Sequence, residues 1–246
     1  MGRVTIKVSD VAAIVGLNKW KSRHEVFDEL WKKHSPETFE GQTNDDKAKA
    51  ALATSEVAQK ACAEARAVET KSSADAVKAF ETARKKIEAD PSLNSEQKED
   101  VINHIRSKVY TAHGTRSEDK TAAKVEVSEK TRLVRDDAFY TAEICEMEGT
   151  KYVLCGRVDR IEEKPDGTRI LVEIKNRTRA LFKKVVDYEM VQVQIYLHML
   201  GLENARLVEQ HNNATLSHDI QKDPEFWNEI YPKIREFCEE LHNVLT

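Results

Sequence analysis

The sequence predicts an α/β protein with a central mixed β-sheet flanked by helices. Up to about residue 130, apolar residues recur at the three- and four-residue spacing of helices, and an Ala-rich stretch adds helix propensity. Beyond it, short runs of β-branched and aromatic residues alternate with turn residues, which is typical of strands. A chain of 246 residues can bury a sizeable core, and we interpret residues 1–246 as a single domain.

Residues 1–42 are expected to contain two helices. Ser9 has the side chain of an N-cap for the first helix, whose apolar residues continue to Gly16. Ser22 is placed to cap the second helix, and its apolar residues also recur at helical spacing. This helix should end at Ser35–Pro36, because the residue before a proline disfavours the helical conformation.

Residues 43–112 are rich in Ala, Lys and Glu and nearly free of Gly, a composition that favours helices. We expect one helix over about 45–69 and another over about 73–89, with a break at Asp90–Pro91. The apolar faces of these two helices are thin, so the pair is interpreted as an exposed hairpin rather than as core.

A third helix is expected after the break. Asn94 and Gln97 have the spacing of a capping box, in which each side chain bonds the backbone N–H of the other residue. Apolar residues at helical spacing follow, and the helix is predicted to continue past Gly114 to about Val127.

The rest of the chain is predicted to contain strands and two further helices. In order, we expect strands at about 139–144, 151–161 and 169–174, a helix at about 183–200 closed by Gly201, strand residues within 205–220, and a helix from Asp223–Pro224 onward. Turn residues at Glu148–Thr150 and Pro165–Gly167 separate the first three strands.

Composition and charge exclude several classes of protein. The net charge of −4 argues against a nonspecific nucleic-acid coat protein but not against a nuclease, because a metal site concentrates carboxylates. No apolar run approaches the roughly 18 residues that a membrane helix needs, and the first residues lack the apolar core of a signal peptide. We expect an intracellular protein that is neither secreted nor bound to a membrane. The histidines and cysteines lack zinc-site spacing, and no Gly-rich phosphate loop for ATP is present.

The residues that carry chemistry lie on two neighbouring expected strands. Glu173 and Lys175 are two positions apart, so their side chains share one face while apolar residues pack on the other. Asp159 ends the preceding strand and can meet them at one sheet edge. Two carboxylates can hold Mg²⁺ beside a phosphate oxygen, and a lysine can position or deprotonate the attacking water or stabilise developing charge.

Each part of this set is weak evidence when taken alone. A Glu-x-Lys pair on a strand is more often part of a solvated face. Gln192 and Tyr196 share a helix face, but either could be an ordinary polar residue of an otherwise apolar helix. Glu118 follows Gly114 by four residues and by itself would more often be a solvated helix residue. The order of the whole set favours a catalytic site.

The ordered set resembles the PD-(D/E)XK nuclease superfamily, and within it the phage lambda exonuclease or YqaJ-like branch, which shares motifs with RecB-type nucleases. The motifs are Glu118, Asp159, Glu173-x-Lys175 and Gln192-x-x-x-Tyr196, together with the helix Ser9–Gly16, the segment Gly114–Glu118 and the segment Gln192–Gln194. Val158 stands where the superfamily often has a proline. The resemblance covers about residues 1–35 and 105–200. It implies a restriction-endonuclease-like core, within which residues 43–110 form a helical insertion.

The resemblance implies Mg²⁺-dependent hydrolysis, with Mn²⁺ expected to substitute. The metal ligands would be Glu118, Asp159, Glu173 and the carbonyl oxygen of Ile174, and the catalytic residues would be Asp159, Glu173, Lys175, Gln192 and Tyr196. Gln192 would orient Lys175 or the water, with Tyr196 supporting it. Some RecB-like relatives hold an iron–sulfur cluster on four grouped cysteines. Cys62, Cys145, Cys155 and Cys238 are not grouped in that way, so no iron–sulfur cluster is expected.

Basic residues follow the catalytic strand closely, where phosphate contacts would supply nonspecific affinity for DNA. The expected DNA-binding residues are Arg3, Ser9, Arg116, Arg177, Arg179, Lys183 and Lys184. By resemblance, Ser9 would bind a 5′-terminal phosphate with help from Arg3, whose spacing differs from that of relatives. An ordinary charged connection after the strand stays equally open from the residues alone.

We therefore expect a Mg²⁺-dependent exonuclease that acts 5′→3′ on linear duplex ends in recombination, repair or viral DNA processing. Three alternatives stay open from the sequence: an endonuclease or flap nuclease of the same superfamily, a non-catalytic DNA-binding module, and a helical interaction protein built on residues 43–110. The resemblance further implies a single-strand annealing protein as partner and a homotrimer.

Overall fold

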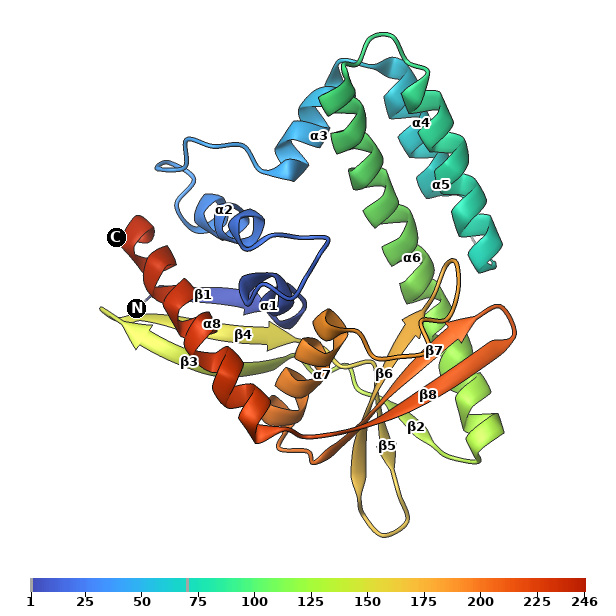
Figure 1. Cartoon of the computed structure of the whole chain (residues 1–246), viewed down its shortest axis with the longest axis vertical. Helices are drawn as coiled ribbons and strands as arrows, with labels where there is room; N and C mark the ends of the chain where they lie inside the picture. The colour runs from blue at the N-terminus through green and yellow to red at the C-terminus, as the bar shows by residue number, and fades with distance from the viewer. Residues whose placement is uncertain (1, 70) are drawn as a thin grey trace.

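The computed structural model describes residues 2–69 and 71–246 and confirms the predicted α/β class (Figure 1). The strands are β1 (Gly2–Lys7), β2 (Leu133–Arg135), β3 (Tyr140–Met147), β4 (Thr150–Gly156), β5 (Arg160–Glu163), β6 (Arg169–Asn176), β7 (Asn204–His211) and β8 (Ala214–Gln221). They form two mixed sheets, in the orders β1-β4-β3 and β2-β5-β6-β7-β8. The sequence predicted one central sheet, whereas the strands form two. The strand predicted at 151–161 is also divided, into β4 and β5, because residues 157–159 separate them.

The helices begin and end largely where local signals predict. They are α1 (Val8–Ile14), α2 (Arg23–His34), α3 (Asn44–Ala53), α4 (Glu56–Ala67), α5 (Ser73–Glu88), α6 (Ser95–Glu129), α7 (Asp187–Leu200) and α8 (Pro224–Leu245). Ser22 and Asn94 each form a capping box, and Gly201 closes α7 in the left-handed conformation at φ 64°. Helix α7 starts four residues later than predicted, because Lys183 has φ 59°, which a helix does not allow. None of the helices described is long and apolar enough to cross a membrane.

The first residues correct two expectations. Residues Gly2–Lys7 form a strand that the sequence did not predict, and it pairs in parallel with β4, almost 150 residues away. Ser9 is not the N-cap of α1. The cap position is Lys7, which makes no side-chain cap bond, and Ser9 lies exposed in the first turn. The strand continues directly into the helix, which leaves no extended position for Ser9 to occupy.

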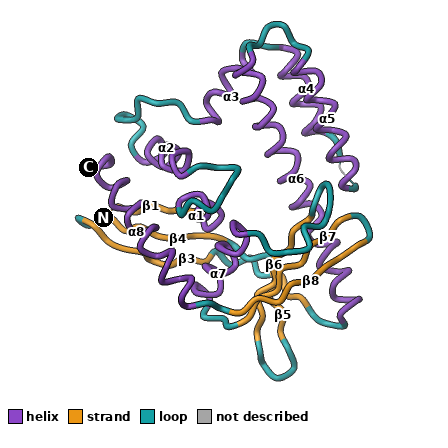
Figure 2. Tube along the Cα trace, viewed as in Figure 1, coloured by secondary structure: helices purple, strands orange, loops and turns teal. Residues whose placement is uncertain are grey.

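The helices of the insertion lie side by side (Figure 2). They bury a core of their own, which corrects the interpretation as an exposed hairpin. Small side chains from α4 and α5 pack with larger ones, among which Phe80 and Ile87 on α5 and Ile105 on α6 are almost fully buried. The helix predicted over 45–69 is interrupted, because Ser55 caps α4 by accepting the N–H of Ala58 at 2.9 Å. The hydroxyl of Ser55 also donates to Asp90, which closes the insertion at its far end.

Helices α6 and α7 cover opposite faces of β6, which positions the site. Val172 and Ile174 pack with Val125 of α6, whereas Leu171 belongs to the main core with Val193 of α7. Helix α6 is one uninterrupted helix of 35 residues that begins within the insertion and ends on the sheet, as predicted. The main core also contains α1, α2 and α8, which pack beside β1, β3 and β4 (Figure 1).

Candidate active site

Asp159 and Glu173 meet at an open edge of β6. Strand β5 pairs with β6 only as far as Arg160 opposite Val172, so β6 extends beyond its neighbour on that side. Asp159 lies in the connection directly before β5, and its Oδ2 accepts the backbone N–H of Ile174 at 2.7 Å. This bond places the Asp159 carboxylate beside the strand that carries Glu173.

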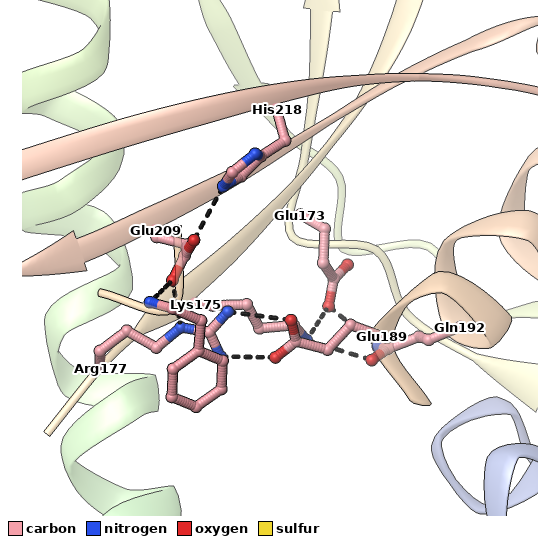
Figure 3. A network of polar contacts seen from close by, with 8 residues as sticks. Glu173, Lys175, Arg177, Glu189, Gln192, Glu209 and His218 are labelled. Atoms are coloured by element: carbon pink, nitrogen blue, oxygen red, sulfur yellow. Dashed lines mark hydrogen bonds and ion pairs between the residues drawn. The ribbon is translucent and has the colours of Figure 1, made fainter. Parts of the chain in front are cut away.

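Lys175, Glu173 and Gln192 form a closed set of hydrogen bonds (Figure 3). The Lys175 ammonium donates to Glu173 Oε1 at 2.8 Å and to Gln192 Oε1 at 3.1 Å, and Gln192 Nε2 donates to Glu173 Oε1 at 2.9 Å. Strand alternation puts Glu173 and Lys175 on the face that α7 covers, and α7 supplies Gln192. The predicted catalytic lysine is thus fixed by two residues that the sequence also named.

The electrostatics of this cluster are those of a cation site. Burial and the nearby charge of Glu173 raise the pKa of Asp159 to about 7. Burial disfavours the charged form of Lys175, yet the carboxylates of Glu173 and Asp159 raise its pKa. Two acids are therefore held close together against their mutual repulsion, an arrangement that a bound divalent cation would stabilise.

Three oxygen donors of this cluster suit a hard metal ion. Glu173 Oε2 is buried and has no hydrogen-bond partner among the described residues. The N–H and C=O of one strand residue point to the same side, so the carbonyl of Ile174 lies on the side of Asp159. With the Asp159 carboxylate, these are the oxygen ligands that Mg²⁺ prefers. The donor set therefore fits the predicted metal.

Glu118 stands beside this set and is held by Arg160. The Arg160 guanidinium, 4% exposed, donates to Glu118 Oε1 at 2.6 Å and also bonds Asp119. The same guanidinium nitrogen that donates to Glu118 also donates to the backbone carbonyl of Asp159, and burial and the charge of Asp159 raise the pKa of Glu118. As they stand, no three Asp, Glu, His or Cys side chains within 2–69 and 71–246 form a group that could hold a metal. The sequence did not predict Arg160, whose partners lie about 40 positions away.

The fold and its local geometry agree with a match to a family model. Residues 21–246 match the PD-(D/E)XK nuclease superfamily. The chain belongs to this superfamily. Its members are nucleases that act on DNA and typically use a divalent metal ion. Among curated proteins, no relative matches.

Two solved structures show the extent of similarity within known folds. An alkaline exonuclease from Laribacter hongkongensis is 13% identical, with a TM-score of 0.44 over 82% of this chain and 94% of that one. A phage related exonuclease from Haemophilus somnus 129PT is 12% identical, with a TM-score of 0.41 over 98% of this chain and 93% of that one.

Arg177, which the sequence predicted to bind DNA in this PD-(D/E)XK chain, is held in a buried network of ion pairs. It is 9% exposed and donates to both oxygens of Glu189, at 2.5 and 2.9 Å, and to Glu209 at 2.9 Å (Figure 3). Its guanidinium also stacks on Phe182, 3.9 Å from the ring centre. Glu209 completes the network by accepting from His218 at 2.8 Å. Arg177 therefore joins β6, α7 and β7 inside the protein.

The other predicted DNA-binding residues lie in different places. Arg3 is remote, because it pairs with Lys151 at the far end of β4 and lies about 13 Å before Lys7 along β1. Arg179 reaches Glu81 of the insertion at 3.4 Å, and Arg116 donates to the carbonyl of Val68 at 3.2 Å. The exposed residues of the set are Ser9, Arg116, Arg179, Lys183 and Lys184, besides Arg3.

Tyr196 packs directly on the backbone of Gly156. A Cβ added to Gly156 would overlap the Tyr196 hydroxyl and lie 3.0 Å from its Cε1. Tyr196 is 3% exposed, and burial, followed by the charge of Glu173, raises its pKa. The absence of a side chain at Gly156 therefore lets Tyr196 close the space between α7 and the Asp159 connection.

We expect Gly156→Ala to destabilise the protein by about 1–3 kcal/mol, because the buried tyrosine must move. Gly114→Ala is the matched control. A Cβ there meets nothing within 4 Å, and replacing a helical glycine should stabilise α6 by about 0.5–1 kcal/mol. Urea unfolding measured by circular dichroism compares the two. Equal stability of both variants would contradict the packing described for Tyr196.

Proposed function

We propose that this PD-(D/E)XK protein is a Mg²⁺-dependent deoxyribonuclease, and that it acts as a 5′→3′ exonuclease on linear duplex ends. The catalytic part of the proposal rests on two hydrogen bonds, one from the Ile174 N–H to Asp159 and one from Lys175 to Glu173. Glu173 Oε2 has no hydrogen-bond partner among the described residues, so it is available to a metal ion. Asp159, Glu173 and the Ile174 carbonyl would hold the metal, with Glu118 as a further ligand.

The residues of the site have separate tasks in this proposal. A bound Mg²⁺ would neutralise charge on the phosphate and lower the pKa of a coordinated water. Lys175 donates hydrogen bonds and can hold the attacking water or stabilise negative charge on a phosphate oxygen. Gln192 fixes the Lys175 ammonium at 3.1 Å, and Tyr196 packs behind Gln192 on the same helix.

The exonuclease part rests on Ser9 and the motif resemblance. Strands β1 and β4 are parallel and end side by side, with Lys7 opposite Cys155. Ser9 follows β1 by two residues and Asp159 follows β4 by three, so both lie beyond the carboxyl ends of these two strands. An exposed hydroxyl at this place supports the proposal that Ser9 binds a 5′-terminal phosphate. A homotrimer and a single-strand annealing partner are further proposals that rest on the resemblance alone.

End-labelled linear duplexes and closed circles test the proposal. We expect Mg²⁺ to release nucleotides from linear DNA only, and a chelator to abolish the release. Ser9→Ala should slow the digestion of 5′-phosphorylated ends about tenfold, because one charge-assisted contact is lost. The same variant should digest 5′-hydroxyl ends like the wild type, which makes that substrate the internal control. Equal attack on closed circles would overturn the exonuclease assignment and leave an endonuclease.

A further inference from the structure

A polar pocket of about 400 Å³ lies between the insertion, α6 and the carboxyl end of β6. Its lining comes from the start of α5, from one face of α6, and from residues of β6 and the β7–β8 turn. This α6 pocket is defined by Lys71, Ser73, His113, Lys120, Lys124 and Asn176. The sequence did not single out any of them.

The charge of the pocket is positive and uncompensated. No Asp or Glu is among its lining residues, and Lys71, Lys120 and Lys124 form no ion pair with any described residue. Lys124 donates only to the backbone carbonyl of Asn212, at 3.3 Å. Asp75, one turn into α5, accepts the backbone N–H groups of Lys71 and Ser72 and does not line the pocket. Three lysines thus line the pocket, with no ion-pair partner in the described part of the protein and no acidic residue beside them in the lining.

A neutral group of the pocket also lacks a partner. His113 is 4% exposed, and its Nδ1 has no hydrogen-bond partner among the described residues. Ser73 begins α5, whose first N–H groups are already bonded within the capping box of Ser72 and Asp75. The three lysines and the unpartnered His113 ring nitrogen, which can donate a hydrogen bond, indicate an anionic ligand.

The pocket adjoins the catalytic site through neighbouring residues. Asn176 follows Lys175 on β6, and Ser117, another lining residue, precedes Glu118 on α6. Asn176 ties the two elements together, because it donates to the carbonyl of Gly114 at 3.0 Å and accepts from Thr121 at 2.6 Å. The pocket and the catalytic residues therefore lie at the same end of β6, with Asn176 on the α6 face of the strand and Lys175 on the α7 face.

We propose that the α6 pocket binds a phosphate group of the DNA backbone beside the reacting phosphate. This inference rests on the proposed function, since it names where that substrate is held. Lysine ammonium groups bind phosphate without base preference, so the pocket contributes affinity and position rather than sequence specificity. It also gives the insertion a role, because α5 supplies one wall of the pocket.

Equilibrium binding separates the pocket from catalysis. Fluorescence anisotropy of a labelled linear duplex in chelator measures affinity while hydrolysis is blocked. We expect Lys120→Ala combined with Lys124→Ala to weaken binding about tenfold and to lower the slope of log K against log salt by about 1. Lys60→Ala with Lys85→Ala is the matched control, since both lysines are exposed in the insertion and lie outside the pocket. Unfolding midpoints should not differ among the variants.

Inorganic phosphate provides the second arm, measured by ³¹P line broadening. Loss of both DNA affinity and phosphate broadening only in the pocket variant supports the proposal. Loss of phosphate broadening with unchanged DNA affinity overturns it in favour of a free-phosphate site. Identical behaviour of the pocket and control variants overturns the pocket altogether. Wild-type protein that broadens phosphate but neither binds nor cuts DNA would refute the proposed function while leaving the anion pocket standing.

Discussion

Lys175→Ala is expected to lower the rate of DNA hydrolysis by about 100- to 1000-fold, because one positioned cation is removed from the reacting centre. The Lys175 ammonium donates to Glu173 and Gln192 and cannot be replaced by a neighbour, since the next cation along the chain, Arg177, is held by two carboxylates. Single-turnover digestion of a labelled duplex with saturating Mg²⁺ measures the effect on the chemical step.

Lys164→Ala is the matched control for this prediction. Lys164 is exposed in the turn between β5 and β6, on the same hairpin but away from the catalytic end. Its removal should change the rate less than about twofold, because an exposed charge at this distance is screened by salt. If Lys175→Ala kept the wild-type rate, hydrolysis would not depend on Lys175, and the catalytic role proposed for this residue would be wrong.

Arg177→Met is expected to destabilise the fold by about 3–5 kcal/mol. The variant leaves Glu189, 3% exposed, without either of its two bonds to the guanidinium. Glu209 is fully buried and keeps the Phe182 N–H and His218 as partners, so Glu189 accounts for most of the cost. Urea unfolding at neutral pH measures the change.

Two further variants make the Arg177 prediction specific. Adding Glu189→Gln to Arg177→Met should recover part of the loss, because an uncharged amide is far less costly to bury unpaired than a carboxylate. Arg179→Ala, two positions on, removes a 69% exposed guanidinium and should cost less than about 0.5 kcal/mol. A loss below about 1 kcal/mol for Arg177→Met would show that the buried network contributes little and that Arg177 can turn outward.

Helix ends were predicted well where the deciding groups lie within a few residues of each other. Ser22 with Glu25 and Asn94 with Gln97 form the expected capping boxes, and Ser35 and Gly201 end their helices. Interactions across long stretches of sequence escaped the prediction. Strand β1 pairs with β4, which lies far along the chain. Its alternation of apolar Val4 and Ile6 with polar neighbours is typical of a strand and could have marked it.

The site shows the same division. Alternation along β6 correctly placed Glu173 beside Lys175, and helical spacing placed Gln192 toward them. By the same alternation Arg177 belongs to the face of Glu173 and Lys175. Its side chain is buried, because it forms ion pairs with Glu189 on α7 and Glu209 on β7. Basic residues after a strand are expected to be exposed only where no buried acidic residue from another element can pair with them. The sequence alone does not show which acidic residue lies next to Arg177 in the fold.

Because α6 is unbroken, it couples the position of the helical insertion to the position of Glu118. From Ser95 to Glu118 the helix spans about 35 Å, and Asn176 pins it to β6 near Gly114. A sideways displacement of about 3 Å at Ser95, about 28 Å from Gly114, turns the helix by about 6° and moves the end of a side chain about 5 Å long by about 0.5 Å, beyond the ±0.2 Å tolerance of metal–ligand distances. A contact that displaces the helical insertion would therefore move the Glu118 carboxylate by a fraction of an ångström.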